Sequence, residues 1–325
     1  FTITVNPTAQ VDDIANQVVC NLDEVNGLFS TQNTSGTSSY SWTSNVDIGA
    51  GLSGTGDMNF TATNLTSEPI VATTSVIPSF TSGGITNIGD VISFTITVNP
   101  TAQVDQPLDQ VVCNEEDVNV LFTTQNTLGS TSYSWISDID IGAGLSGNDD
   151  MDFTANNLTT APIVATITVT PTFENEGIVC DGEDKTFTIT VNPTAQVDQP
   201  LDQVICNGDT TSIVEFTTEN AGGTTTYAWI NNTPSIGLSG SGSGDILAFT
   251  ATNITTEPIV ATITVTPEFE FDGKVCDGED KTFTITVNPT VVVNTLADQY
   301  ITSGQTSSLV NISSNTTNVI FNWTA

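Results

Sequence analysis

Five cysteines offer the most distinctive covalent chemistry of the chain, and they are Cys20, Cys113, Cys180, Cys206 and Cys276. Thiols pair as disulfides in the oxidising environment outside the cell, whereas cytosolic thiols stay reduced. Abundant Thr, Ser and Asn with few lysines suits an extracellular protein, so disulfides are expected, and five reduced, buried thiols are the alternative. Zinc is less expected, because the chain has no histidine to complete a typical site.

Carboxylates recur in two identical turns and make calcium the one cofactor to consider. Calcium binds hard oxygen ligands. The candidate ligands are Asp181, Glu183, Asp184, Asp277, Glu279 and Asp280. The spacing does not match a calcium loop that ends in a bidentate glutamate. The alternative is therefore a pair of solvated acidic turns that hold no metal.

Enzymatic chemistry has little to draw on. The chain contains 37 acidic residues, three lysines, no histidine and no arginine, with a net charge of −34. Without histidine or arginine it cannot build a Ser–His or Cys–His pair or a bidentate anion clamp. The acidic residues recur from repeat to repeat, which suits a shared surface better than one glycosidase cleft. We therefore predict a protein that is not an enzyme and does not bind nucleic acid, because its surface repels phosphate.

Several polar triplets are candidates for glycosylation. Asn64, Asn157 and Asn253 begin Asn-x-Thr triplets at equivalent places, and Thr210 follows Asp209 in a short candidate motif for O-glycosylation. Such triplets arise freely in a chain rich in Asn and Thr, so ordinary turn residues are the alternative interpretation.

One strand sequence divides the chain into repeats. Phe-Thr-Ile-Thr-Val-Asn-Pro begins at Phe1, Phe94, Phe187 and Phe283, at intervals of 93, 93 and 96 residues. Its alternating apolar residues predict a half-buried strand, which the Asn-Pro ends because proline cannot donate to a ladder. The predicted domains are residues 8–100, 101–193 and 194–289, with a truncated fourth at 290–325. Residues 1–7 would be the closing strand of a preceding repeat, disordered or borrowed by another chain.

Each repeat has the pattern of a small β-sandwich. About six or seven short strands, separated by turn residues, predict an all-β, immunoglobulin-like (Ig-like) sandwich. A Tyr-x-Trp pair in the third strand places both aromatics on one face, as core residues of such a fold, with a sugar-stacking platform as the alternative. The predicted core tryptophans are Trp42, Trp135, Trp229 and Trp323.

Aligning the repeats predicts which cysteines pair. Cys113 and Cys180 fall in the second repeat, and Cys206 and Cys276 fall in the third. Each pair would close most of its own domain, and the chain-entropy model gives each bridge about 4 kcal/mol. Cys20 has no partner in the first repeat, so it would be a free thiol or form an intermolecular bridge.

The repeat resembles a known family. The matching segments in the third repeat are Val204-Ile-Cys-Asn-Gly208, Tyr227-x-Trp229, Ile236-Gly-Leu238, Val275-Cys276 and Phe283 to Pro289. They are similar to the PKD-like, Ig-like tandem repeats of large secreted surface proteins of Bacteroidota. The resemblance implies an extracellular string of sandwiches, often in adhesins of gliding or biofilm-forming bacteria exported by the type IX route.

Three functions follow as expectations. The first is a non-enzymatic stalk or fibre in cell adhesion, at the cell surface. The second is a building block of an extracellular filament formed by contacts between the repeats, and the third is an accessory module that binds carbohydrate. The expected partners are neighbouring repeats or other copies of the protein, with surface glycans or proteins as further candidates. No run of about 18 apolar residues is present, so no segment is expected to insert into a membrane.

Overall fold

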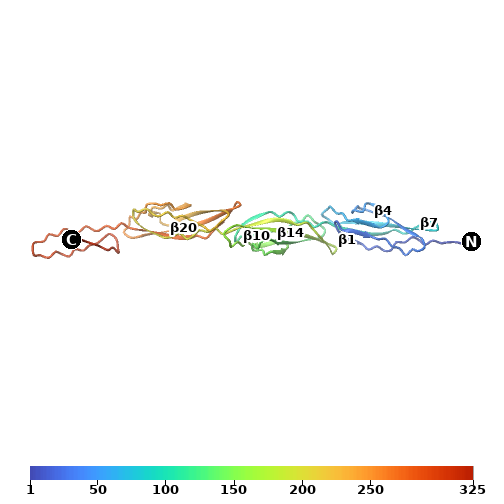
Figure 1. The fold of residues 1–325 in the computed structure, drawn as a ribbon, viewed down its shortest axis with the longest axis horizontal. Helices are drawn as coiled ribbons and strands as arrows, with labels where there is room; N and C mark the ends of the chain where they lie inside the picture. Colours follow the sequence, from blue (N-terminus) through green and yellow to red (C-terminus); the bar gives the residue numbers. More distant parts are fainter. Residues whose placement is uncertain (325) are drawn as a thin grey trace. The chain divides into compact units, whose positions relative to one another are not determined.

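The computed structural model describes residues 1–324, which contain 22 strands and one short 3-10 helix. The contacts divide the chain into two compact units. The first unit contains residues 1–110, 117–154 and 164–189, and the second contains 111–116, 155–163 and the residues from 190 onward. The sheets define three successive β-sandwiches, so the chain is an all-β protein of tandem Ig-like repeats (Figure 1).

The first sandwich lies wholly in the first unit. Its larger sheet has the strand order β1-β8-β6-β3-β4, with β7 paired to the far part of β6, and its smaller sheet pairs β2 with β5. The bounds are β1 Gln17–Cys20, β2 Glu24–Gly27, β3 Thr37–Ser44, β4 Ser53–Thr55, β5 Met58–Thr61, β6 Ile70–Ser82, β7 Ile85–Ile88 and β8 Ile92–Asn99. Residues of both sheets, among them Val25, Met58 and Trp42, form one buried core.

The other two sandwiches repeat this order, as β12-β11-β14-β16-β9 and as β17-β22-β20-β18-β19. The second comprises β9 Gln110–Cys113, β10 Asp117–Val120, β11 Ser130–Ser137, β12 Ser146–Asn148, β13 Met151–Thr154, β14 Ile163–Asn175, β15 Ile178–Asp181 and β16 Lys185–Asn192. The third comprises β17 Gln203–Cys206, β18 Thr224–Asn231, the helix η1 Pro234–Ile236, β19 Ser241–Ser243, β20 Ile259–Phe271, β21 Lys274–Asp277 and β22 Lys281–Asn288. The third sandwich closes with the isolated bridges of Val214 to Ile246 and Thr210 to Thr250 in place of a second sheet.

The closing strand behaves as its alternation predicts in three of its four copies. Phe283, Ile285 and Val287 of β22 are buried in the core of the third sandwich, because a strand turns every second side chain to the same face. In the first copy, Phe1 and Ile3 are exposed and lie outside the strands. That copy therefore contributes no closing strand within residues 1–324.

A proline marks the point where the longest strand changes partners. In the third sandwich β20 pairs with β22 as far as Val265, and from Glu268 onward it pairs with the hairpin strand β21. Pro267 lies between these two ladders, where the missing N–H removes no bond to either strand. The far end of β20 therefore extends beyond its pairing with β22 and forms a hairpin with β21.

The glycine-rich loop of the first sandwich, residues 48–56, contains the short edge strand β4 as well as turns. Gly49 and Gly56 have positive φ, as expected for turn glycines. In the equivalent loop of the second sandwich, Gly147 is required by packing, because a Cβ there would lie 2.4 Å from the Trp135 ring. Because Gly147 has no side chain, the ring of the core tryptophan Trp135 can pack against the edge strand β12.

Trp42, Trp135 and Trp229 are buried, which confirms them as core residues. The same prediction for Trp323 is wrong for the described chain, because its side chain is 75% exposed. Residues 290–324 form no sheet that covers it, and their one bridge joins Val293 to Ser314.

Candidate functional site: disulfide-linked joints between repeats

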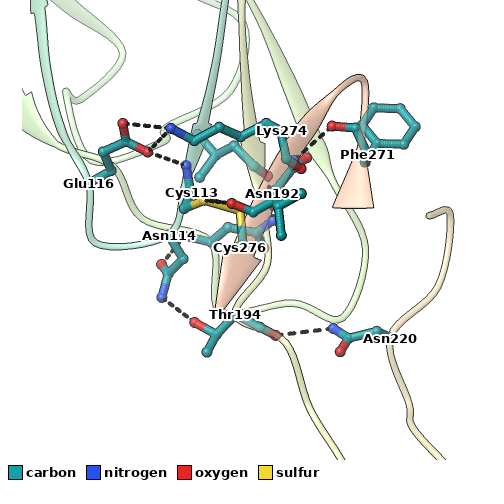
Figure 2. Close-up of a disulfide and its surroundings, with 12 residues drawn as sticks. Cys113, Asn114, Glu116, Asn192, Thr194, Asn220, Phe271, Lys274 and Cys276 are labelled. Atoms are coloured by element: carbon teal, nitrogen blue, oxygen red, sulfur yellow. Dashed lines mark hydrogen bonds and ion pairs between the residues drawn. A yellow bond between two sulfur atoms is a disulfide. The ribbon is translucent and has the colours of Figure 1, made fainter. Parts of the chain in front are cut away.

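Two disulfides join residues of consecutive repeats. Cys20 pairs with Cys180 inside the first compact unit, with a Cα–Cα distance of 5.6 Å and a sequence separation of 160 residues. Cys113 pairs with Cys276 inside the second unit, also at 5.6 Å, with a separation of 163 residues (Figure 2). Cys206 is exposed and unpaired among the described residues. We call the residues around these two disulfides the first and second joints.

The predicted pairing of Cys113 with Cys180 and of Cys206 with Cys276, with Cys20 left free, is therefore wrong. In the third sandwich Cys206 lies opposite Asn288, the last residue of β22, and that end of β22 lies beside Ile259. Cys276 lies opposite Phe269, ten residues further along β20 and so roughly 33 Å away. A disulfide needs Cα atoms within about 7 Å, so the two cysteines of one repeat cannot meet.

The parallel first strand fixes the first cysteine of each joint. Cys20 ends β1 and lies in register with Asn99 at the end of β8. Its N–H donates to a carboxylate oxygen of Asp23 at 2.8 Å, and the N–H of Cys113 donates to Glu116 at 2.9 Å. These bonds satisfy a backbone donor where the strand ends, so the cysteine is held in place by its own repeat.

An asparagine at the end of each closing strand binds the hairpin of the next repeat. In the first joint the side chains of Asn99 and Asn175 bond to each other, Asn175 Nδ2 donating to Asn99 Oδ1 at 2.9 Å. In the second joint Asn192 Nδ2 donates to the carbonyls of Phe271 and Lys274 at 3.0 and 3.3 Å (Figure 2). Both Asn99 and Asn192 are 0% exposed. The two joints therefore share a buried polar contact beside the disulfide.

The second joint lacks one bond that the first joint makes. Asn192 Oδ1 is buried and has no partner among residues 1–324. Phe271 occupies the position at which the first joint has Asn175, and its side chain offers no donor. This substitution accounts for the unpaired oxygen.

A second group of contacts joins the same consecutive repeats through residues outside the hairpin. In the first joint the N–H of Thr127 donates to the Ser67 carbonyl at 3.0 Å, and Thr127 Oγ1 donates to Glu68 at 3.1 Å. In the second joint the N–H of Ala221 donates to the Thr160 carbonyl at 2.8 Å. The backbone linker is also held, because Asn21 donates to Thr101 Oγ1 at 2.9 Å and its equivalent Asn114 donates to Thr194 Oγ1 at 3.0 Å.

The asparagines proposed as glycosylation sites instead form part of the fold. Asn157 is 2% exposed, and its Nδ2 donates to the carbonyls of Val191 at 2.7 Å and Ala161 at 2.9 Å. Asn64 and Asn253 make equivalent bonds from equally buried positions. A buried amide with both hydrogens engaged has no room for a glycan, so these three assignments are wrong for the folded protein. Thr210 is exposed.

We expect Asn157→Ala to destabilise the second sandwich by about 2 kcal/mol, because two carbonyls and the N–H of Thr159 lose a buried partner. The matched control is Leu158→Ala in the same turn. Leu158 is 86% exposed, so this change should alter stability by less than about 0.5 kcal/mol. Denaturant unfolding followed by fluorescence measures both, and equal effects of the two substitutions would contradict the role of the buried amide.

One ion pair forms within residues 1–324, and it belongs to the second joint. Lys274 Nζ lies 2.9 Å from the Glu116 carboxylate, with side chains 35% and 38% exposed. The N–H of Cys113, and after it Lys274, hold the pKa of Glu116 below its usual value. Because the folded pKa is depressed, this contribution is present above the unfolded value of about 4.3 and is lost as pH falls through the folded pKa.

Glu116→Gln is therefore expected to lower stability at neutral pH by less than about 1 kcal/mol, since both partners are partly solvated. The difference from the parent should disappear once the pH is below the folded pKa of Glu116. Unfolding midpoints of both proteins across an acid titration measure this. A difference that grows on acidification would show that the carboxylate does not act as an anion here.

The candidate calcium ligands are not gathered into a site. Among residues 1–324, no group of three or more carboxylate, cysteine or histidine side chains is placed to hold a metal ion. Asp184 instead accepts a hydrogen bond from Thr170 Oγ1 at 2.6 Å, and Asp280 accepts one from the equivalent Thr266. These carboxylates therefore bond within the strands and turns of their own sandwich.

No protein family matches the sequence, and no curated protein is similar to it. Solved structures that resemble the chain include the I9–I11 tandem of titin, with 11% identity over 87% of this chain and 100% of that one, at a TM-score of 0.29. Three N-terminal domains of the outer capsid protein Hoc of bacteriophage RB49 are 12% identical over 88% of this chain and 99% of that one, at a TM-score of 0.40. Domains EC22–24 of mouse cadherin-23 are 12% identical over 87% of this chain and 99% of that one, at a TM-score of 0.36. The assignment as tandem Ig-like sandwiches rests on the sheet topology described above.

Proposed function

We propose that this chain is a non-enzymatic structural segment of a long surface protein, in which tandem Ig-like repeats act as a stalk in cell adhesion. The observation that carries this proposal is that consecutive repeats are bonded covalently at two joints of the same design. Domains connected by a peptide linker alone move relative to one another by default. A disulfide and a buried asparagine beside the linker oppose that motion, which suits a spacer that must hold its length.

The charge of the chain also suits a stalk. A net charge of −34 makes neighbouring copies repel one another and keeps the chain soluble. This repulsion favours separate strands over a filament built by lateral contacts between repeats. The same charge opposes binding to nucleic acid or to anionic lipid.

The disulfides are typical of a protein that folds outside the reducing cytosol. Within residues 1–324, the structure has no helix with the length and apolar character needed to cross a bilayer. The disulfides support an extracellular stalk, and a composition without histidine or arginine supports a role without catalysis.

Small-angle scattering of the oxidised and reduced chain tests the role of the joints. Reduction should leave the far-ultraviolet circular dichroism unchanged and should broaden the distribution of distances within the molecule, because the repeats stay folded while the joints loosen. Identical scattering of both forms would contradict the proposed stiffening. Antibodies against residues 8–289 should label intact cells, and labelling that requires permeabilised cells would contradict a surface location.

A further inference from the structure

The third sandwich carries a third copy of the surface that receives a hairpin in the first two joints. Cys206 is in register with Asn288, as Cys20 is in register with Asn99. The linker contact is present as well, since Asn207 Nδ2 donates to Thr290 Oγ1 at 2.8 Å. The surface is therefore already built by the third repeat itself.

Residues 290–324 repeat part of the bonding found at the start of the second and third repeats. Asn315 accepts from the N–H of Val292 at 2.7 Å, as Asn220 accepts from the N–H of Gln196 at 2.6 Å. Thr317 Oγ1 donates to Glu257 at 3.2 Å, a bond similar to that of Thr127 to Glu68 in the first joint but made one residue later in the alignment. Besides the linker bond, one contact between residues 290–324 and the third sandwich is thus already in place.

A groove lies where the hairpin would sit. It has a volume of about 550 Å³ and is lined by Cys206, Glu257, Asn288, Thr317 and Val319, among others. Asn288 is partly exposed here, whereas the equivalent Asn99 and Asn192 are fully buried. In the first two joints one element, the hairpin of the next repeat, contacts both the equivalent cysteine and the equivalent asparagine. In the third sandwich the cysteine and the asparagine border the groove instead.

We propose that this groove binds the hairpin of a fourth Ig-like repeat, the repeat that residues 290–324 begin, and that Cys206 forms a disulfide with it. The partner cysteine is expected 160 to 163 residues after Cys206, the separations of the two existing bridges. Its hairpin should resemble the sequence Val-Cys-Asp-Gly-Glu-Asp-Lys, which both existing hairpins contain. Oxidation removes two electrons and two protons from the two thiols, and a disulfide exchange catalyst or oxygen outside the cell accepts them.

This inference rests on the proposed function only in taking the chain as a series of like repeats, and its test does not depend on adhesion or stiffness. The probe is a synthetic hairpin of residues 269–281, cyclised through its backbone, with Cys276 as its single thiol. The control peptide has the same composition in scrambled order. Each is equilibrated with the 325-residue chain in a glutathione buffer, and the mixed disulfide with Cys206 is quantified by intact mass.

The hairpin should form the mixed disulfide with an equilibrium constant at least about tenfold larger than the scrambled peptide gives. Asn288→Ala should remove most of that preference, because Asn288 is the equivalent of Asn192, whose amide binds the hairpin carbonyls in the second joint. Cys206→Ser should abolish the adduct. Equal constants for the two peptides would overturn the proposal. So would disulfide mapping of the native protein that found Cys206 free, dimerised with a second Cys206, or bonded outside the expected hairpin.

Discussion

Replacing Cys113 and Cys276 together with serine is expected to destabilise the chain by about 2 to 5 kcal/mol. In the chain-entropy model a loop of 163 residues corresponds to about 5 kcal/mol, and removal of a natural disulfide typically costs 2 to 5 kcal/mol. The bridge also holds Asn192 against the hairpin carbonyls of Phe271 and Lys274. Its loss should therefore weaken the buried contact as well. Denaturant unfolding without reductant measures the change.

The control for this variant is Cys206→Ser, which removes the exposed, unpaired thiol. It should leave the unfolding midpoint unchanged, because no bond and no core contact is lost. If Cys206→Ser were the more destabilising change and the double variant were neutral, the pairing at the second joint would be contradicted.

Trp229→Ala is expected to destabilise the third sandwich by about 3 to 5 kcal/mol. Trp229 is 6% exposed, packs in the core with residues of both β20 and β22, and donates its indole N–H to the Gly244 carbonyl at 3.1 Å. The truncation would leave a large cavity and an unpaired carbonyl. The third sandwich should then unfold at a lower temperature than its neighbours in calorimetry.

Trp323→Ala provides the matched control. Trp323 aligns with Trp229 in the sequence, in the segment Phe321-Asn-Trp323, but its side chain is 75% exposed. It should change stability by less than about 0.5 kcal/mol. A large effect of Trp323→Ala would show that residues 290–324 pack more tightly than described.

The fold could be predicted from the sequence because it depends on local alternation. Phe94, Ile96 and Val98 recur at every second position, and the structure buries all three. A core tryptophan in the third main strand follows from the same reasoning. These signals need no knowledge of how distant segments meet.

The cysteine pairing could not be predicted in this way. A scheme within repeats leaves Cys20 free, the observed scheme leaves Cys206 free, and each uses four of five cysteines. The number and spacing of thiols therefore do not distinguish them. What decides is that the first strand runs parallel to the closing strand, which places the two cysteines of a repeat at opposite ends of the sheet. The hairpin strand β21 has four residues and begins with lysine, so alternation gives it no clear signal.

The asparagine triplets show a similar limit. Asn64-x-Thr66 looks the same in sequence whether its amide faces solvent or the end of β8. The structure places that amide against the Val98 carbonyl at 2.7 Å, next to the joint. The triplet therefore helps to fix the end of the closing strand from which the hairpin-binding Asn99 projects.

Cyanogen bromide cleavage tests the joints most directly, because the chain has two methionines, Met58 and Met151. Free thiols are first alkylated, and the cleaved protein is weighed with and without reductant. Pairing between repeats predicts that fragments 1–58, 59–151 and 152–325 stay linked until reduction, with the alkyl group on Cys206. Release of fragment 1–58 without reductant, with the alkyl group on Cys20, would contradict disulfides between consecutive repeats.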